Sequence, residues 1–384
     1  MNVPEPKMPF IAIACGGTGG HLFPGIAIAE ELKKHGCKIA LLISPKEIDQ
    51  QAVKSARGFE IFTLPAVGLQ NRNYFSFAKN FLKSLFAARK IFKKQKPDAV
   101  LAMGGFTSAP PVFVGKDFGA KTFLHESNTI PGKANRYLAR FVDEAFVGFA
   151  ETQSKLRAKK VSVAGTPVRP QFQIQETAKC RTGLHLDPNL PTILVVGGSQ
   201  GASGLNEMIL SALPLLAQKN WQWLHLTGAN DLEKVEAAYA VKNLKAVVKP
   251  FLSEMDLALG AATVCVSRAG ASSLSEIAAK RLPSLLVPFP AAADNHQFFN
   301  AVAFEKSGAA ELLEQKNSTP EKMAAILIEL VENQNVRAQM QSALAQWHTP
   351  NAAALVVERI LKTIVQKAKA QNICRCGHAH GHAH

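Results

Sequence analysis

Three short segments of this 384-residue chain place small residues directly after an apolar run and directly before a helical stretch. They are residues 16–20, 197–203 and 267–276. Such a turn lets backbone N–H groups approach an anion at the positive end of a helix dipole. Neither glycine loop fits the spaced dinucleotide fingerprint or the Walker loop. A single turn of this kind also serves tight packing, but two of them, one in each half, favour an enzyme that holds a phosphate-bearing ligand.

The third segment contains an acidic residue that has two interpretations. Ser272 and Ser273 lie near the expected start of a helix, and Glu276 follows about one turn later. A carboxylate at this position can act as a partner in a helix cap. It can equally hold two neighbouring ribose hydroxyls, as acidic residues do in nucleotide sites.

The elements that must position these segments occur twice along the chain. Apolar runs at 11–14 and 193–196 each precede a glycine loop, and further apolar runs alternate with helical stretches in both halves. The other expected strands are residues 38–43, 99–103, 121–124, 223–226, 246–249, 264–267 and 284–287. This alternation predicts an α/β protein with two doubly wound parallel-sheet domains. Open parallel sheets bind ligands at the carboxyl ends of their strands, where the loops are expected to lie.

Turn-forming residues indicate the domain boundaries. Residues 165–170 (GTPVRP) predict a linker between a first domain at 8–166 and a second at 167–350. A last helix at 352–369 follows Pro350 and is expected to pack back on the first domain. The Cys- and His-rich segment 370–384 is compatible with zinc binding, a disordered tail or an affinity tag, and carries no functional argument.

Composition excludes several classes of protein. Hydrophobic residues make up 47% and charged residues 19%, which is typical of a soluble enzyme. No run of about 20 apolar residues predicts a membrane span, and no signal peptide is visible, so we expect a cytoplasmic protein. Six scattered cysteines predict reduced thiols rather than a disulfide framework.

The net charge of +15 is concentrated in the first half. Residues 1–165 hold 24 Lys and Arg against 12 Asp and Glu. Residues 74–96, from Tyr74 to Lys96, combine five Phe and one Tyr with seven basic residues. Phe81, Leu85, Ala88 and Phe92 form one helical stripe, which most often faces a protein core. A cationic amphipathic helix also binds an anionic membrane surface. Nucleic acid is the other polyanion that fits, but no recognition motif for it is present.

Five motifs recur in the order and spacing of a known family: GGTGGHLFPG at 16–25, MGGFTS at 103–108, HESN at 125–128, GSQGA at 198–202, and 267–276. On these motifs the chain resembles the MurG family of N-acetylglucosaminyltransferases over residues 8–365. Ser127 departs from the family's usual Gln, and one extra small residue follows Phe289. The resemblance implies a GT-B fold with an interdomain cleft and transfer of N-acetylglucosamine from UDP-N-acetylglucosamine to lipid I. The implied location is peripheral, on the cytoplasmic face of the inner membrane, with residues 74–96 on the anionic leaflet and other cell-wall synthesis proteins as partners.

The resemblance also implies the site residues. Ser199 would contact the diphosphate, Arg169 would lie close to the nucleotide, and Leu252 would present backbone groups to uracil. Glu276 would hold the ribose and Gln297 the sugar hydroxyls. The helix start, at Ala271, Ser272, Ser273, Leu274 and Ser275, would line phosphate and ribose. From the first domain, the residues expected to close over the sugar and the acceptor diphosphate are Thr18, Gly19, Gly20 and Asn128.

The chemistry of this transfer requires stabilisation of a departing UDP and a base for the acceptor hydroxyl. No Asp-x-Asp pair is present, so we expect helix termini rather than a metal ion to stabilise the diphosphate, and no cofactor. His21 is the first candidate base, with a loop-stabilising role as the alternative. Glu126 is the second, with a capping role as the alternative. Displacement in one step inverts the anomeric configuration.

Two other functional classes remain open from sequence. One is another GT-B-like UDP-sugar enzyme, such as a glycolipid synthase or a UDP-sugar epimerase. The motifs at 103–108 and 125–128 argue against it, because they are specific to the lipid I enzymes rather than to UDP-sugar binding. The other is a non-enzymatic scaffold, which the presence of Glu276, Ser199 and His21 disfavours.

Overall fold

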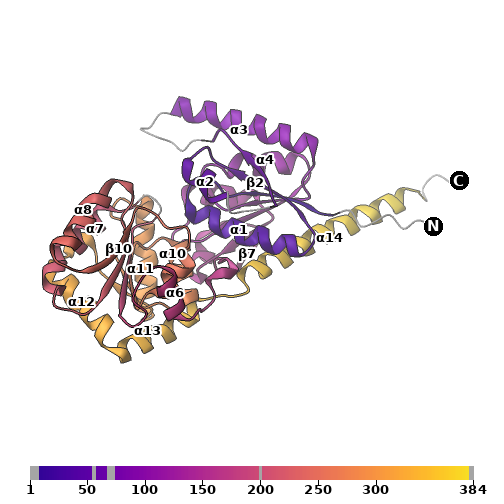
Figure 1. Cartoon of the computed structure of the whole chain (residues 1–384). Coiled ribbons are helices and arrows are strands. Elements are labelled where there is room, and N and C mark those ends of the chain that lie inside the picture. The colour runs from indigo at the N-terminus through magenta and orange to yellow at the C-terminus, as the bar shows by residue number, and fades with distance from the viewer. Residues whose placement is uncertain (1–7, 54–57, 67–73, 199–200, 380–384) are drawn as a thin grey trace. The chain divides into compact units, whose positions relative to one another are not determined.

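The computed structural model describes residues 8–53, 58–66, 74–198 and 201–379, and these divide into two compact units (Figure 1). Unit 1 comprises Met1–Ser127, Pro131–Pro167 and Asn351–His384. Unit 2 comprises Asn128–Ile130 and Val168–Pro350. Each unit is built on its own parallel sheet, as the alternating apolar runs predicted.

Unit 1 has a seven-stranded parallel sheet in the order β3-β2-β1-β4-β5-β6-β7. The strands are β1 (Phe10–Ala14), β2 (Lys38–Ile43), β3 (Glu60–Thr63), β4 (Ala99–Ala102), β5 (Lys121–Glu126), β6 (Glu144–Val147) and β7 (Val161–Val163). The helices are α1 (Gly19–Lys34), α2 (Glu47–Ala52), α3 (Tyr74–Lys94), α4 (Ala109–Asp117), α5 (Lys133–Leu138) and α14 (Ala352–Ala379). Alternate strand residues face opposite layers. Ile11 and Ile13 pack with α1 and α14 on one face, while Ala12 and Ala14 pack with α3 and α4 on the other.

Unit 2 has a six-stranded parallel sheet in the order β10-β9-β8-β11-β12-β13. The strands are β8 (Thr192–Val196), β9 (Gln222–Leu226), β10 (Lys245–Lys249), β11 (Val264–Ser267), β12 (Ser284–Leu286) and β13 (Glu311–Leu312). The helices are α6 (Thr177–Gly183), α7 (Ser203–Leu216), α8 (Leu232–Val241), α9 (Met255–Ala261), α10 (Ala271–Lys280), α11 (His296–Lys306), α12 (Pro320–Glu332) and α13 (Gln334–Trp347). Because all strands are parallel, the loops after β8, β10, β11 and β12 lie along one edge of the sheet.

The basic segment at 74–96 forms α3, and its apolar stripe belongs to the core over its C-terminal half. Ala88 and Phe92 are fully buried against the sheet, with Leu85 partly buried beside them. A different set of apolar side chains on α3 is exposed: Phe75 by 82%, Leu82 by 53% and Phe86 by 71%. None of the helices within the described residues is long and apolar enough to cross a membrane.

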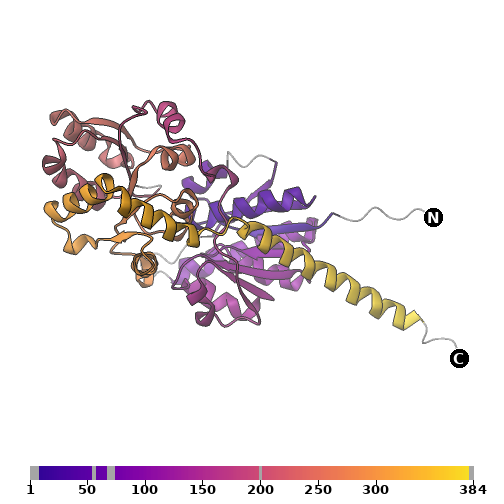
Figure 2. The same ribbon diagram turned by 90° about the horizontal axis from the view of Figure 1, so that it is seen from below.

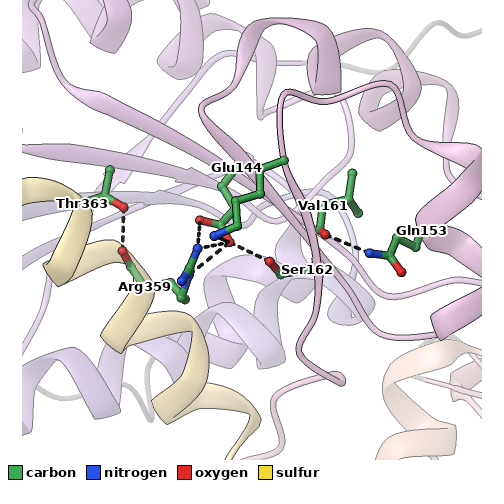
Figure 3. Close-up of polar contacts among 7 residues, drawn as sticks. Glu144, Gln153, Val161, Ser162, Arg359 and Thr363 are labelled. Carbon is green, nitrogen blue, oxygen red and sulfur yellow. Dashed lines mark hydrogen bonds and ion pairs between the residues drawn. The ribbon is translucent and has the colours of Figure 1, made fainter.

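The last helix, α14, packs on α1 and then continues beyond it (Figure 2). Glu144 on β6 anchors it, because the nearly buried carboxylate accepts from Nε and Nη2 of Arg359, both at 3.2 Å (Figure 3). Ser162 donates to the same carboxylate at 2.7 Å, and Lys160 lies 3.3 Å from it. The helix was expected to end at Lys369, but it extends to Ala379. Residues 370–376 contain neither Gly nor Pro, so nothing in the backbone ends the helix there.

Candidate functional site

The first glycine loop joins β1 to α1 and is held by the segment after β2. The Gly17 N–H donates to the buried carboxylate of Asp49 at 2.6 Å, and Lys46 Nζ donates to the Gly17 carbonyl at 2.9 Å. A Cβ on Gly16 would lie 2.2 Å from the Ser44 nitrogen, and Gly17 has a φ of +114°. Only glycine therefore fits at these two positions. Thr18 and Gly20 are exposed and Gly19 is half-buried, which leaves the start of α1 accessible.

His21 lies in the first turn of α1, against a second pair of glycines. Its Nδ1 is 3.2 Å from the Thr18 hydroxyl. A Cβ on Gly104 would lie 2.9 Å from the imidazole ring, and one on Gly105 would lie 3.2 Å from it. This contact with Thr18 agrees with the loop-stabilising role, which was the alternative to a catalytic base in the sequence analysis. The half-buried ring is held in place by its surroundings, which a positioned base also requires.

Glu126, at the end of β5, is engaged by the turn that starts α5. One carboxylate oxygen accepts from the Gly132 N–H at 2.9 Å and from Asn135 Nδ2 at 2.8 Å. Only 3% of the residue is exposed. This geometry supplies the capping contacts of the alternative interpretation.

His125 occupies the neighbouring strand position and is fully buried. Its Nε2 donates to the Gly165 carbonyl at 2.9 Å, and its Nδ1 lies 3.3 Å from the hydroxyl of Ser127. Burial lowers the pKa of His125. A neutral imidazole with both nitrogens engaged links β5 to the linker backbone at Gly165, which is a structural role.

In unit 2 the second glycine loop leads into α7. Gly201 has a φ of +77°, and a Cβ there would lie 2.3 Å from the Thr227 carbonyl oxygen. Ser199, the expected diphosphate contact, lies outside the described residues. On either side of it, the described residues Gly198 and Gly201 are joined by a backbone hydrogen bond of 3.0 Å.

The third segment folds as expected, with β11 ending at Ser267 and α10 beginning at Ala271. The residue before α10 is Gly270, which has no side chain to cap the helix. As the first residues of a helix, Ala271, Ser272 and Ser273 have N–H groups without an intrahelical partner. Leu274 is buried, and the hydroxyl of Ser275 donates to the Ala271 carbonyl at 2.9 Å. The open amides at this helix start are suited to a phosphate group.

Glu276 pairs with Arg169, which sequence analysis had placed separately in the linker. Arg169 Nη2 lies 3.4 Å from the Glu276 carboxylate, and the two side chains are only 11% and 12% exposed. Burial raises the pKa of Glu276 to about 7, while the Arg169 charge opposes that rise. The helix-cap interpretation of Glu276 is wrong, because its carboxylate pairs with Arg169 and not with the helix start.

Two further expected residues follow strand ends on the same edge of the sheet. Leu252 is buried, while its neighbour Phe251 is 50% exposed and follows β10 and Pro250. Gln297 lies in the first turn of α11, and its Oε1 accepts from the N–H groups of Ala269 (3.2 Å) and Phe289 (2.9 Å). Its NH₂ group has no partner among the described residues and can donate to a ligand hydroxyl.

Asn300 is a buried residue of the candidate site that the sequence analysis missed. It is fully buried, and its Oδ1 accepts from both the N–H and the hydroxyl of Thr129, each at 2.9 Å. Its Nδ2 donates to Asn128 Oδ1 and to the Ala269 carbonyl, each at 3.1 Å. Asn300 thus orients Asn128, an expected site residue. The available signal was the i, i+3 spacing of Gln297 and Asn300, which places both on one face of α11.

No group of three or more His, Cys, Asp or Glu side chains that could hold a metal ion occurs in the described part of the chain. The described donors along the carboxyl edge of unit 2 are instead backbone amides, a guanidinium and side-chain amides. This set fits a phosphate-bearing, hydroxyl-rich ligand.

Comparisons with known proteins agree with this geometry. Residues 11–147 match the glycosyltransferase family 28 N-terminal domain, and residues 192–356 match the C-terminal domain of that family. The crystal structure of Acinetobacter baumannii MurG superimposes with a TM-score of 0.73 at 29% identity, covering 92% of this chain and 99% of that one. A UDP-glucosyltransferase from Polygonum tinctorium gives a TM-score of 0.70 at 15% identity, covering 94% of this chain and 99% of that one, which shows a shared fold alone. The expected GT-B fold class is confirmed.

Two sequence relatives carry the name UDP-N-acetylglucosamine–N-acetylmuramyl-(pentapeptide) pyrophosphoryl-undecaprenol N-acetylglucosamine transferase. The one from Anaeromyxobacter sp. (strain Fw109-5) is 36% identical over 357 residues, which cover 90% of this chain and 91% of the relative. The one from Syntrophus aciditrophicus (strain SB) is 35% identical over 361 residues, which cover 92% and 98%. The chain therefore belongs to glycosyltransferase family 28 and, within it, to the N-acetylglucosamine transferases of this name.

Proposed function

We propose that this chain transfers N-acetylglucosamine from UDP-N-acetylglucosamine to the 4-hydroxyl of the N-acetylmuramoyl sugar of lipid I, with inversion, giving lipid II and UDP. The names of the relatives support this choice of substrates. The single observation that carries it is the buried Arg169–Glu276 pair in unit 2, where Glu276 lies on α10, the helix with the uncapped start. A carboxylate for ribose and a helix start for diphosphate together suit a nucleotide-diphosphate sugar.

Unit 2 is the donor-binding part in this proposal, and unit 1 binds the acceptor. Glu276 accepts from the ribose hydroxyls, and the NH₂ group of Gln297 donates to the sugar. The remaining donor residues are Arg169, Ser199, Leu252, Ala271, Ser272, Ser273, Leu274 and Ser275. Thr18, Gly19, Gly20 and Asn128 act on the sugar and on the acceptor diphosphate.

The reaction breaks the bond between the anomeric carbon and the UDP oxygen as the acceptor oxygen forms its new bond. The departing diphosphate gains negative charge, which the amides and dipole at the start of α10 stabilise. The acceptor hydroxyl must lose its proton to a base. His21 suits this role better than Glu126, because one Glu126 oxygen already accepts from Gly132 and Asn135.

We propose further that α3 docks unit 1 on the anionic cytoplasmic leaflet of the inner membrane. The exposed residues Phe75, Leu82 and Phe86 are spaced seven and four apart and so share one face. Exposed cations follow the same side of the helix: Lys79, Lys83, Lys90 and Lys93. Each basic side chain near such a surface contributes about 1 kcal/mol. These exposed residues replace the stripe through Phe81 as the membrane contact.

The proposed activity is tested by incubating radiolabelled UDP-N-acetylglucosamine with a lipid I analogue and separating the products. Label transfer into the disaccharide lipid, with release of UDP, is expected. Free labelled sugar with no lipid product, or transfer only to a different acceptor, would contradict the proposal.

A further inference from the structure

A basic groove lies in unit 2 at the amino ends of β11 and β12. It has a volume of about 620 Å³ and is framed by α6, α9, α10 and α13. This edge of the sheet is opposite to the one that carries the glycine loop and the start of α10. Because α10 is ten residues long, its two ends are separated by about 15 Å. The groove meets the last turn of α10, and its lining contains neither Arg169, Glu276 nor the start of the helix, so it is distinct from the proposed donor site.

Four cations line the groove, and none of its lining residues is acidic. They are Arg181 on α6, Lys280 and Arg281 at the end of α10, and Arg337 on α13. Burial lowers the pKa of Arg181 and that of Lys280. The groove therefore holds several positive charges that are partly removed from water, and an anion would stabilise them.

The donors of these side chains are only partly used by the protein. Arg181 donates to the carbonyls of Ala261 and Pro188 and to the hydroxyl of Thr263. Lys280 donates to the Gln173 carbonyl and to Gln175, which leaves one of its three N–H groups. Arg281 is different. Its guanidinium makes no hydrogen bond or ion pair with the described part of the chain, so all its side-chain donors remain available.

The backbone of Arg281 is also unfavourable for its residue type. It ends α10 in the left-handed region, with φ +49° and ψ +42°. Glycine is the residue that usually ends a helix in this conformation, because a Cβ there is disfavoured. A non-glycine residue that keeps such a conformation points to a function for its side chain.

We propose that this groove binds a small multivalent anion bearing phosphate groups, such as a diphosphate or triphosphate, at a site separate from the donor site. Its volume lies within the range of small-ligand pockets. A guanidinium presents paired donors that match phosphate oxygens, and Arg281 is free to do so. Lys280 and Arg337 border the same space and add charge from two helices.

The test is calorimetric titration of the full chain with tripolyphosphate, with and without excess UDP. We expect one binding site that persists when UDP is present. In Arg281→Gly the affinity should fall at least tenfold, while the Tm should rise by roughly 2–4 °C because the helix end gains its preferred residue. Lys242→Ala, a change at the half-buried lysine that follows α8 and lies outside the groove lining, is the matched control and should bind like wild type.

A second variant keeps the test independent of the helix end. Ser342→Glu places a carboxylate on the exposed rim of the groove, on α13, and should weaken tripolyphosphate binding at least fivefold without changing the Tm. Three results would overturn the proposal: no binding by the wild type, complete loss of binding in excess UDP, or unchanged affinity in both variants. If the protein does not bind UDP, the proposed donor site is wrong, but tripolyphosphate should still bind to the groove. The two proposals can therefore be refuted independently.

Discussion

The role of Glu276 in donor binding can be tested by removing its charge while keeping its shape. In Glu276→Gln the side chain stays in a site where only 12% of it is exposed, so water cannot replace the lost acceptor. A hydrogen bond to a charged group contributes about 1.5–3 kcal/mol, and the burial favours the upper part of that range. A loss of about 2–3 kcal/mol corresponds to UDP affinity weakened roughly 30- to 150-fold.

The assay compares UDP with 2′-deoxy-UDP in calorimetric titrations of wild type and variant. If Glu276 accepts from the ribose hydroxyls, the substitution should weaken UDP far more than 2′-deoxy-UDP. The pH dependence provides a second readout. Because the pKa of Glu276 is about 7 and the ionised form is the acceptor, wild-type affinity for UDP should rise from pH 6 to pH 8. The Gln variant should lack that part of the rise, and 2′-deoxy-UDP controls for titration of the phosphate itself.

Thermal unfolding of the ligand-free protein separates this role from a structural one. A folded-state pKa raised from 4.5 to about 7 means that the carboxyl favours folding at low pH and that this contribution is lost as the pH rises through 7. Glu276→Gln should therefore leave the Tm at pH 8 unchanged or higher. Equal weakening of both ligands, or a lower Tm that accompanies the loss of affinity, would refute the ribose assignment.

Three other predictions concern metal dependence, membrane docking and the anchor of α14. Activity should survive excess EDTA, because helix termini stabilise the diphosphate; loss that Mg²⁺ or Mn²⁺ restores would contradict this. Replacing Phe75, Leu82 and Phe86 together by Ser should reduce co-sedimentation with phosphatidylglycerol vesicles while sparing turnover of a soluble lipid I analogue, and binding equal to wild type would exclude α3 as the contact. Arg359→Ala should lower the free energy of unfolding in urea by about 1–2 kcal/mol, since Glu144 loses a bidentate partner that is itself partly exposed. An unchanged urea midpoint would show that the Arg359–Glu144 pair does not stabilise the packing of α14.

The sequence by itself determined the architecture, because each buried parallel strand corresponds to a short run of apolar residues that is visible locally. Residues 38–43 and 264–267 were expected as strands and are β2 and β11 with the same bounds. The glycine loops were also visible locally, as small residues after an apolar run, but the close approaches that require Gly16 and Gly201 come from the distant backbones of Ser44 and Thr227. β3 was missed because its residues are mostly exposed and its pattern is not apolar.

Only the tertiary structure decided which residues meet. Arg169 and Glu276 are 107 positions apart, and Asn300 lies 172 positions from Asn128, so no local pattern relates them. The same holds for α3, where spacing alone shows two apolar stripes and only packing against the sheet buries Ala88 and Phe92 and leaves Phe75 and Phe86 exposed. Local patterns depend on each residue's own neighbours along the chain, whereas pair formation and burial depend on how distant segments pack, which is set by the whole fold.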